Sequence, residues 1–321
     1  MPVVLVERRV RAAVLESFRS PFKVVETTVR VPEDWVEVRV RAVGVCGRDL
    51  VVWKGGFPNL RTPLILGHEV FGEYEGVPVS VFPGLSVEEC RRAGGECPGY
   101  AILGEHVPGG YADRVYVPRS NLIPLPDRDY RKYAAATCGV ATIMHASSVA
   151  GIRPGERVLV TGASGGVGVH GLQYLINLGV EVIALTRSEE KARILEGLGA
   201  RAVTRPDFYR EMGRVDAVLE LVGARTINWS MRALRQKGRL VLVGNVTGEQ
   251  VIIERPALLV MREISLHGTA AFTPKEWRSA IQVISRGIIK PFYKVYDLDE
   301  INEAYEAALK GERVGRIVLE P

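Results

Sequence analysis

The sequence is poor in amide side chains and has no long uninterrupted apolar run. The glutamines are only Gln173, Gln236, Gln250 and Gln282. Few amides beside many Arg, Glu and Val are typical of proteins from thermophiles, so we expect a thermophilic source. No apolar run is long enough to span a membrane, and the first residues, MPVVLVERRV, lack a signal-peptide pattern. These absences predict a cytoplasmic protein without a membrane partner.

Charge of one sign is not concentrated anywhere in the chain. The net charge is +5 and the pI about 9.0, yet Lys and Arg are spread along the sequence without a long basic block. This distribution argues against a nucleic-acid partner, while a basic surface favours small anionic substrates. With 47% hydrophobic and 25% charged residues, the 321-residue chain has the composition of an ordinary globular protein and the length for two domains.

A glycine-rich turn lies between an apolar run, 158–161, and a helical pattern that ends at Gly179. A second apolar run, 182–185, follows at once, which gives the order strand, turn, helix, strand. Glycines let the backbone approach a pyrophosphate, whose charge rests on the helix N-terminus. In this context the turn predicts a dinucleotide site. Its candidate residues are Gly162, Ser164, Gly165, Gly166, Val167 and Gly168.

The end of the second strand indicates which dinucleotide binds. An NAD site usually has Asp or Glu there to hold the ribose 2′-hydroxyl. This chain instead has Thr186, Arg187 and Ser188, and Lys191 follows one turn into the next helix. A guanidinium suits a 2′-phosphate, so the sequence favours NADP(H) over NAD. The alternative is that Arg187 is a solvated surface residue.

Two kinds of pattern divide the chain. The first part alternates apolar and polar residues in short runs rich in Gly and Pro, whereas strands and helices alternate after about residue 150. The second pattern predicts a doubly wound parallel sheet, with Val222, Gly244 and Asn245 at strand ends near the cofactor. We therefore expect an α/β fold with a β-rich domain at 1–138, completed by 269–321, and a dinucleotide-binding domain at 139–268.

Four motifs, GVCGRDL, LGHE, GASGGVG and VGRIVL, occur in this order over almost the whole chain. In sequence and order they resemble the zinc-type medium-chain dehydrogenase/reductase superfamily, in particular archaeal alcohol dehydrogenase-like proteins, including acryloyl-CoA reductases. The resemblance implies a Rossmann domain joined to a GroES-like catalytic domain. It also implies a homodimer or homotetramer.

The resemblance implies a catalytic zinc held by Cys46, His68 and Cys138. Thiolate, imidazole and thiolate suit tetrahedral Zn²⁺ and leave one position open. Glu69 matches a carboxylate that lies near the metal and can serve as a transient fourth ligand. The alternative is that the two cysteines are small buried apolar residues.

Three further roles follow from the resemblance. Asp49 matches the carboxylate that orients the zinc-bound histidine. Arg316 matches a basic residue that reaches toward Glu69 and the cofactor pyrophosphate. Thr142 matches a residue that packs on the nicotinamide ring.

The chain departs from the family at its second metal site. A structural zinc needs four cysteines at close spacing, and only Cys90 and Cys97 remain. We therefore predict no structural zinc. A Cys90–Cys97 disulfide is an alternative use of the two thiols, since cytosols of hyperthermophiles permit disulfides.

The chain also departs from the family at Arg48. Alcohol dehydrogenases usually have Ser or Thr two residues after the first zinc cysteine, where it starts a proton relay. A guanidinium is never deprotonated in proteins, so Arg48 cannot pass a proton as a hydroxyl does. Arg48 either binds an anionic group in the site or points outward and pairs with a carboxylate.

Three functions remain open. The first is an NADP(H)- and zinc-dependent alcohol dehydrogenase or ketone reductase. The second is an enoyl-thioester reductase of the acryloyl-CoA type, in which Arg48 could hold CoA phosphates. The third is a non-catalytic NADPH-binding protein resembling quinone reductases, and the zinc ligands argue against it.

Overall fold

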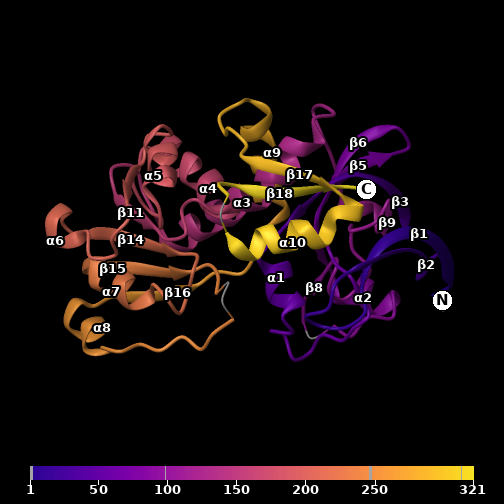
Figure 1. Ribbon diagram of the computed structural model, residues 1–321, viewed down its shortest axis with the longest axis horizontal. Helices are drawn as coiled ribbons and strands as arrows, with labels where there is room; N and C mark the ends of the chain where they lie inside the picture. The colour runs from indigo at the N-terminus through magenta and orange to yellow at the C-terminus, as the bar shows by residue number, and fades with distance from the viewer. Residues whose placement is uncertain (1–2, 98, 246–247, 312) are drawn as a thin grey trace. The chain divides into compact units, whose positions relative to one another are not determined.

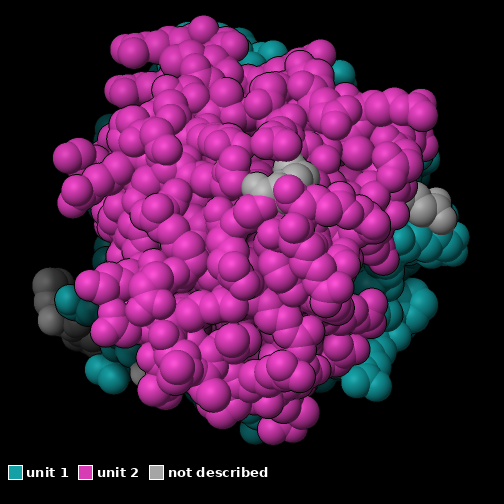
Figure 2. All heavy atoms as spheres, turned by 90° about the vertical axis from the view of Figure 1, so that its left-hand side faces the viewer, with its two compact units in different colours: residues 1–135, 293–312, 316–321 teal, residues 136–292, 313–315 magenta. Residues whose placement is uncertain are grey.

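The computed structural model describes residues 3–97, 99–245, 248–311 and 313–321 (Figure 1). The chain divides into two compact units, which are coloured separately in Figure 2. Unit 1 contains residues 1–135, 293–312 and 316–321, and unit 2 contains residues 136–292 and 313–315. One unit is rich in β-structure and the other is a parallel α/β sheet, so the predicted fold class is confirmed.

Unit 1 is built from β-sheets, and the largest of them combines early strands with β17 and β18 from the other end of the chain. Its sheets have the orders β2-β1-β4 and β10-β6-β5-β3-β18-β17, with β9 also paired to β3, and β7 pairs with β8. The strands are β1 (Leu5–Leu15), β2 (Lys23–Pro32), β3 (Val36–Val45), β4 (Leu64–Ile65), β5 (Glu69–Tyr74), β6 (Val77–Val81), β7 (Gly84–Leu85), β8 (Ala101–Ile102), β9 (Arg114–Val117), β10 (Leu122–Pro124), β17 (Tyr293–Asp297) and β18 (Arg316–Glu320).

The helices of unit 1 are short apart from the connecting helix. They are α1 (Gly47–Trp53), α2 (Val87–Arg92), α10 (Ile301–Lys310), two 3₁₀ turns at Arg119–Asn121 and Leu298–Glu300, and the start of α3 (Tyr130–Ala150), which continues into unit 2. Strand β3 alternates between exposed and buried residues in its first half and is almost wholly buried in its second half. The chain therefore enters the protein interior just before Cys46.

Unit 2 is the predicted doubly wound sheet. Its parallel strands have the order β13-β12-β11-β14-β15-β16, so the order reverses beside β11, where sheets of this kind bind ligands. The elements are β11 (Arg157–Val160), α4 (Gly166–Asn177), β12 (Glu181–Leu185), α5 (Glu189–Glu196), β13 (Arg201–Val203), α6 (Tyr209–Met212), β14 (Val215–Glu220), α7 (Ile227–Ala233), β15 (Leu234–Leu242), α8 (Ala257–Arg262), β16 (Ser265–Gly268) and α9 (Pro274–Ser285).

The segment 269–292 differs from the expected division. The sequence placed it with the β-rich domain, but in the structure it belongs to unit 2. Helix α9 is tied there because Glu276 contacts His145 of α3 at 3.0 Å. The backbone after α9 is tied as well, since the Phe292 N–H donates to His170 Nε2 of α4 at 2.8 Å.

The Cys90–Cys97 pair forms a disulfide, with 6.3 Å between the two Cα atoms. Cys90 lies in α2 and is fully buried. Both thiols are thus used in a covalent bond.

Within the described part of the chain, every helix is too short or too polar to cross a membrane.

Candidate metal centre and dinucleotide site

Unit 1 brings three potential metal ligands to neighbouring ends of β3 and β5. Cys46 directly follows β3, and His68 directly precedes Glu69, the first residue of β5. The two strands are antiparallel, with Gly44 opposite Glu69. A Cβ on Gly44 would lie 2.3 Å from Glu69 Oε2, so glycine is required for this close approach. Strand pairing therefore places Cys46 beside His68 and Glu69.

Cys138 comes from α3, whose first turns pack against β3. A Cβ on Gly44 would also lie 2.5 Å from the Ala134 carbonyl oxygen, and Cys138 follows Ala134 by one helical turn on the same face. The boundary of unit 1 falls after Ala135, within this continuous helix. The ligand atoms of Cys46, His68, Glu69 and Cys138 all lie within 4.8 Å of one another, and all four residues are buried.

This donor set fits a zinc ion. Zinc bonds of about 2.0–2.3 Å place tetrahedral ligand atoms about 3.3–3.8 Å apart, which the compact group permits. Cys46 and Cys138 are free of disulfides. His68 directs Nδ1 at Asp49 and has Nε2 3.8 Å from Glu69 Oε1, so Nε2 is the nitrogen available to a metal.

Charged groups around the ligands fix their orientation. Asp49 Oδ1 lies 3.1 Å from His68 Nδ1, and Asp49 Oδ2 accepts a bond from the Cys46 N–H at 2.8 Å. Burial lowers the pKa of His68, but Asp49 and, to a smaller extent, Cys46 raise it, so that this pKa lies well above its usual value. Arg316 Nη2 lies 3.1 Å from Glu69 Oε1, and both side chains are almost fully buried. This is the contact that the family resemblance implied.

Arg48 pairs with a carboxylate that the sequence analysis did not identify. Its guanidinium binds both oxygens of Glu105, with Nη2 to Oε2 at 2.8 Å, and lies 4.5 Å from the centre of the Phe57 ring. The Glu105 side chain is only 2% exposed, so the pair is not the outward surface contact that we considered. Burial lowers the pKa of Arg48, but the bonds to Glu105 raise it above its usual value.

The glycine turn in unit 2 has the expected place between β11 and α4. Gly162, Ser164 and Gly165 form the turn, and Gly166 to Gly168 open the helix. A Cβ on Gly168 would lie 2.6 Å from Ala163 Cα, so the helix can pack this closely only with glycine. Ser164 accepts a hydrogen bond from Thr186 Oγ1 at 3.2 Å.

Most of the other predicted cofactor residues follow the carboxyl ends of neighbouring strands, and Thr142 lies in α3. Thr186 and Arg187 follow β12, and Arg187 is exposed. Ser188 caps α5 by accepting a bond from the Lys191 N–H at 3.3 Å. The remaining residues lie after β14, β15 and within α3: Val222, Gly244, Asn245 and Thr142, whose Oγ1 is 3.9 Å from Cys138 Sγ.

Glu220 is a residue of this site that the sequence analysis missed. It ends β14 and is fully buried. Its Oε1 accepts bonds from the hydroxyls of Thr161 and Thr226 and from the N–H groups of Val222 and Gly223, at 2.6–3.0 Å. Glu220 therefore joins the turns after β11 and β14. The available signal was a glutamate at the end of a strand whose other residues, apart from Asp216, are apolar.

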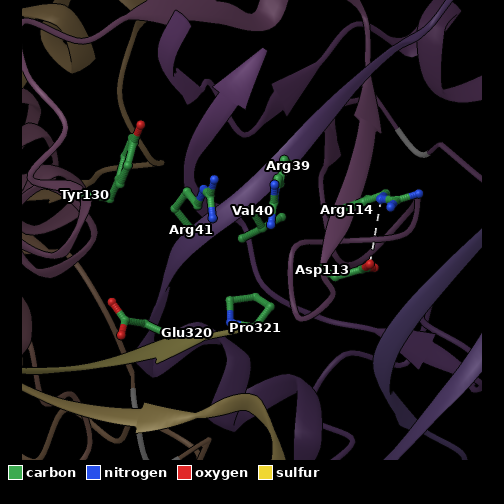
Figure 3. Close-up of a pocket in the computed structure, with 8 residues that line it drawn as sticks. All are labelled: Arg39, Val40, Arg41, Asp113, Arg114, Tyr130, Glu320 and Pro321. Carbon is green, nitrogen blue, oxygen red and sulfur yellow. Dashed lines mark ion pairs between the residues drawn. The ribbon is translucent and has the colours of Figure 1, made fainter. Parts of the chain in front are cut away.

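A separate pocket of about 520 Å³ lies on unit 1 (Figure 3). Arg39 on β3 is one of its lining residues. It precedes Cys46 by seven residues, which corresponds to roughly 20 Å of extended strand between the pocket and the metal ligand. Glu73 binds Arg41 at 2.8 Å and Asp113 lies 3.7 Å from Arg114, so carboxylates offset much of the arginine charge. The lining residues are Arg39, Val40, Arg41, Asp113, Arg114, Tyr130, Glu320 and Pro321. This pocket contains none of the predicted site residues.

Comparisons with known proteins identify the family of this chain. A zinc-binding dehydrogenase model matches residues 166–286, and an alcohol dehydrogenase GroES-like domain model matches residues 32–127. An acryloyl-coenzyme A reductase of Sulfurisphaera tokodaii is 30% identical over 97% of this chain and 100% of its own length. An alcohol dehydrogenase of Geobacillus stearothermophilus is 30% identical over 96% of this chain and 98% of its own length.

A solved structure shows the same relationship. The thermostable alcohol dehydrogenase from Pyrobaculum aerophilum has a TM-score of 0.87 and 30% identity, over 98% of this chain and 100% of that one. The chain is therefore an oxidoreductase of the zinc-type medium-chain dehydrogenase/reductase family.

Proposed function

We propose that this oxidoreductase transfers hydride between NADP(H) and a carbonyl or alcohol substrate, with one catalytic zinc held by Cys46, His68 and Cys138. The buried group of ligand atoms within 4.8 Å supports this function. Zinc at this place supplies a Lewis acid for the substrate oxygen, and the nicotinamide supplies or accepts the hydride.

Other side chains orient the metal ligands and leave room for the cofactor. Asp49 holds His68 through Nδ1, so that Nε2 would be the nitrogen that binds the metal, and Arg316 offsets the buried charge of Glu69. The glycine turn would leave room for the pyrophosphate of the dinucleotide, and Thr142, one helical turn from Cys138, would contact its nicotinamide ring.

A spectrophotometric screen of NADPH oxidation tests this function. We expect turnover with ketones or aldehydes that is lost after removal of the metal and restored by zinc. Turnover by the metal-free protein at the same rate would refute the metal-dependent mechanism.

The second candidate is the reduction of enoyl thioesters such as acryloyl-CoA. It is favoured by the absence of a relay hydroxyl at Arg48, because the reduction of an activated double bond does not need to release an alcohol proton through that relay. Arg48 itself supports this candidate less than the sequence suggested. Two of its guanidinium nitrogens already bind Glu105 and are not available to CoA phosphates. Enoyl-CoA esters belong in the same screen, and turnover with them alone would select this candidate.

Arg187 should give the protein a preference for NADPH. Its exposed guanidinium follows β12, where a 2′-phosphate would lie. We expect Arg187→Ala to remove about 1–3 kcal/mol of that preference, the contribution of a charge-assisted contact. The measurement is the ratio of NADPH and NADH dissociation constants by fluorescence titration. Equal affinities for NADPH and NADH in the unmodified protein would show that Arg187 faces solvent and does not contact the 2′-phosphate.

Arg48 should make alcohol oxidation slow. We expect reduction to be the faster direction, and we expect Arg48→Ser with Glu105→Gln to speed alcohol oxidation about tenfold, less than a complete acid–base group contributes. The double change is needed because Arg48→Ser alone leaves Glu105 buried without its cation. Such a change typically lowers the free energy of unfolding by about 3–5 kcal/mol. Steady-state kinetics in both directions check this. Unchanged constants in the folded double variant would remove Arg48 from the mechanism.

We also propose a homo-oligomer that covers the apolar surface near β16. Ile252, Val260, Met261 and Leu266 are 41–76% exposed, and β16 is the last strand of its sheet. Exposed apolar side chains beside an open strand edge are typical of subunit contacts. Light scattering should show a dimer or tetramer, and a Val260→Glu/Met261→Glu variant should shift the protein toward a monomer.

The cytoplasmic location stays a prediction.

A further inference from the structure

We propose that Tyr111 is a positioning residue for the metal centre, because its hydroxyl holds the Asp49 carboxylate that orients His68. The inference rests on the proposed metal site and adds a residue outside the ligand set. Tyr111 belongs to the segment before β9, far from Cys46 and His68 in sequence.

The backbone and the ring of Tyr111 are both fixed. Its N–H donates to the Leu66 carbonyl at 2.9 Å, and its own carbonyl accepts from the Ala13 N–H at 2.8 Å. The ring occupies the space beside Gly67, where a Cβ would lie 2.4 Å from Tyr111 Cδ1. Tyr111 is therefore packed directly against the residue that precedes the His68 ligand.

The hydroxyl of Tyr111 completes the hydrogen bonding of a buried carboxylate. It donates to Asp49 Oδ2 at 2.9 Å, and the Cys46 N–H donates to the same oxygen at 2.8 Å. The other oxygen lies 3.1 Å from His68 Nδ1. Asp49 is 1% exposed and Tyr111 is fully buried, so these contacts are shielded from water. Without the phenol, Asp49 Oδ2 keeps only the Cys46 N–H of these two donors, so the carboxylate is held less firmly.

Tyr305 on α10 extends this chain of hydrogen bonds. Its hydroxyl donates to the Tyr111 hydroxyl at 3.4 Å. Burial, reinforced by the Asp49 charge, raises the pKa of both tyrosines well above the usual value, so both remain donors. Tyr305 does not touch Asp49 through any of these bonds, which makes it the matched control for Tyr111.

Tyr111→Phe keeps the ring and removes only the donor. We expect its zinc dissociation constant, measured by chelator competition, to rise about three- to tenfold, less than the 10–100-fold typical of a direct partner of a ligand. We also expect the visible spectrum of the cobalt-loaded protein to shift. The increase in Tm on adding zinc should become smaller, because that increase measures binding to the folded state.

Tyr305→Phe and the double variant separate positioning from stability. Tyr305→Phe should lower Tm without changing the zinc constant or the cobalt spectrum. Tyr111→Phe/Tyr305→Phe leaves no orphaned hydroxyl, and it should show the zinc constant of Tyr111→Phe. A Tyr111→Phe protein with the zinc constant and cobalt spectrum of the unmodified protein would overturn the inference. Failure of the unmodified protein to bind zinc would overturn the proposed metal centre itself.

Discussion

A Cys138→Ser variant should fold and bind NADPH, yet lose its zinc and most of its carbonyl reduction. Serine keeps the volume of the buried side chain but is a poor ligand at neutral pH, so two strong ligands remain. Loss of the Lewis acid should lower kcat/KM by at least about 10³-fold, equivalent to about 4 kcal/mol. Metal analysis, NADPH fluorescence and steady-state kinetics measure the three properties.

The Cys90→Ser/Cys97→Ser protein is the control for cysteine loss. It lacks the disulfide but keeps the ligand set, so it should contain about one zinc per chain, like the unmodified protein. Two zinc ions per chain in the unmodified protein would refute the predicted loss of the structural zinc. Full zinc content and activity in Cys138→Ser would refute the ligand assignment.

Glu220→Ala should destabilise unit 2 strongly. Four donors converge on Glu220 Oε1, and the Ser230 hydroxyl binds Oε2 at 2.5 Å. Alanine leaves these buried groups without an acceptor, and we expect the free energy of unfolding to fall by about 4 kcal/mol. NADPH affinity should fall too, since Thr161 and Val222 flank the cofactor turns. Urea unfolding followed by circular dichroism measures the first effect.

Glu220→Gln is the matched variant. Its amide oxygen can serve the four donors at Oε1, and its amide nitrogen can donate to Ser230 Oγ, which both donates and accepts. We expect a loss of only about 1 kcal/mol, the scale of one altered hydrogen bond. If glutamine and alanine destabilise the protein equally, the negative charge of Glu220 matters, and not its acceptor geometry.

Local patterns predicted much of the fold. The strand–turn–helix–strand order around Gly162 and the cap at Ser188 follow from residues that are neighbours in sequence, and the structure has both. The ordered motifs also indicated Cys46, His68 and Cys138 as one group, because a family resemblance carries spatial information that one sequence does not.

Contacts between distant residues account for what the sequence did not reveal. Glu105 lies 57 residues after Arg48, and neither residue has a pattern that names the other. The sequence around Tyr111 and Glu220 does not indicate that both side chains are buried in the fold or which residues they contact. The assignment of 269–292 differed for the same reason, since α9 is amphipathic and could cover either unit.

Strand β18 is synthesised after all the other described strands, but it lies inside a sheet of unit 1, between β3 and β17. A ribosome therefore completes all of residues 136–292 before it releases the strand that pairs Val318 with Gly44. Domains fold as units during synthesis, so the continuous part of unit 2 can fold first. Until Arg316 emerges with β18, Glu69 lacks its buried cation. We expect nascent chains to bind dinucleotide before they can complete the metal centre.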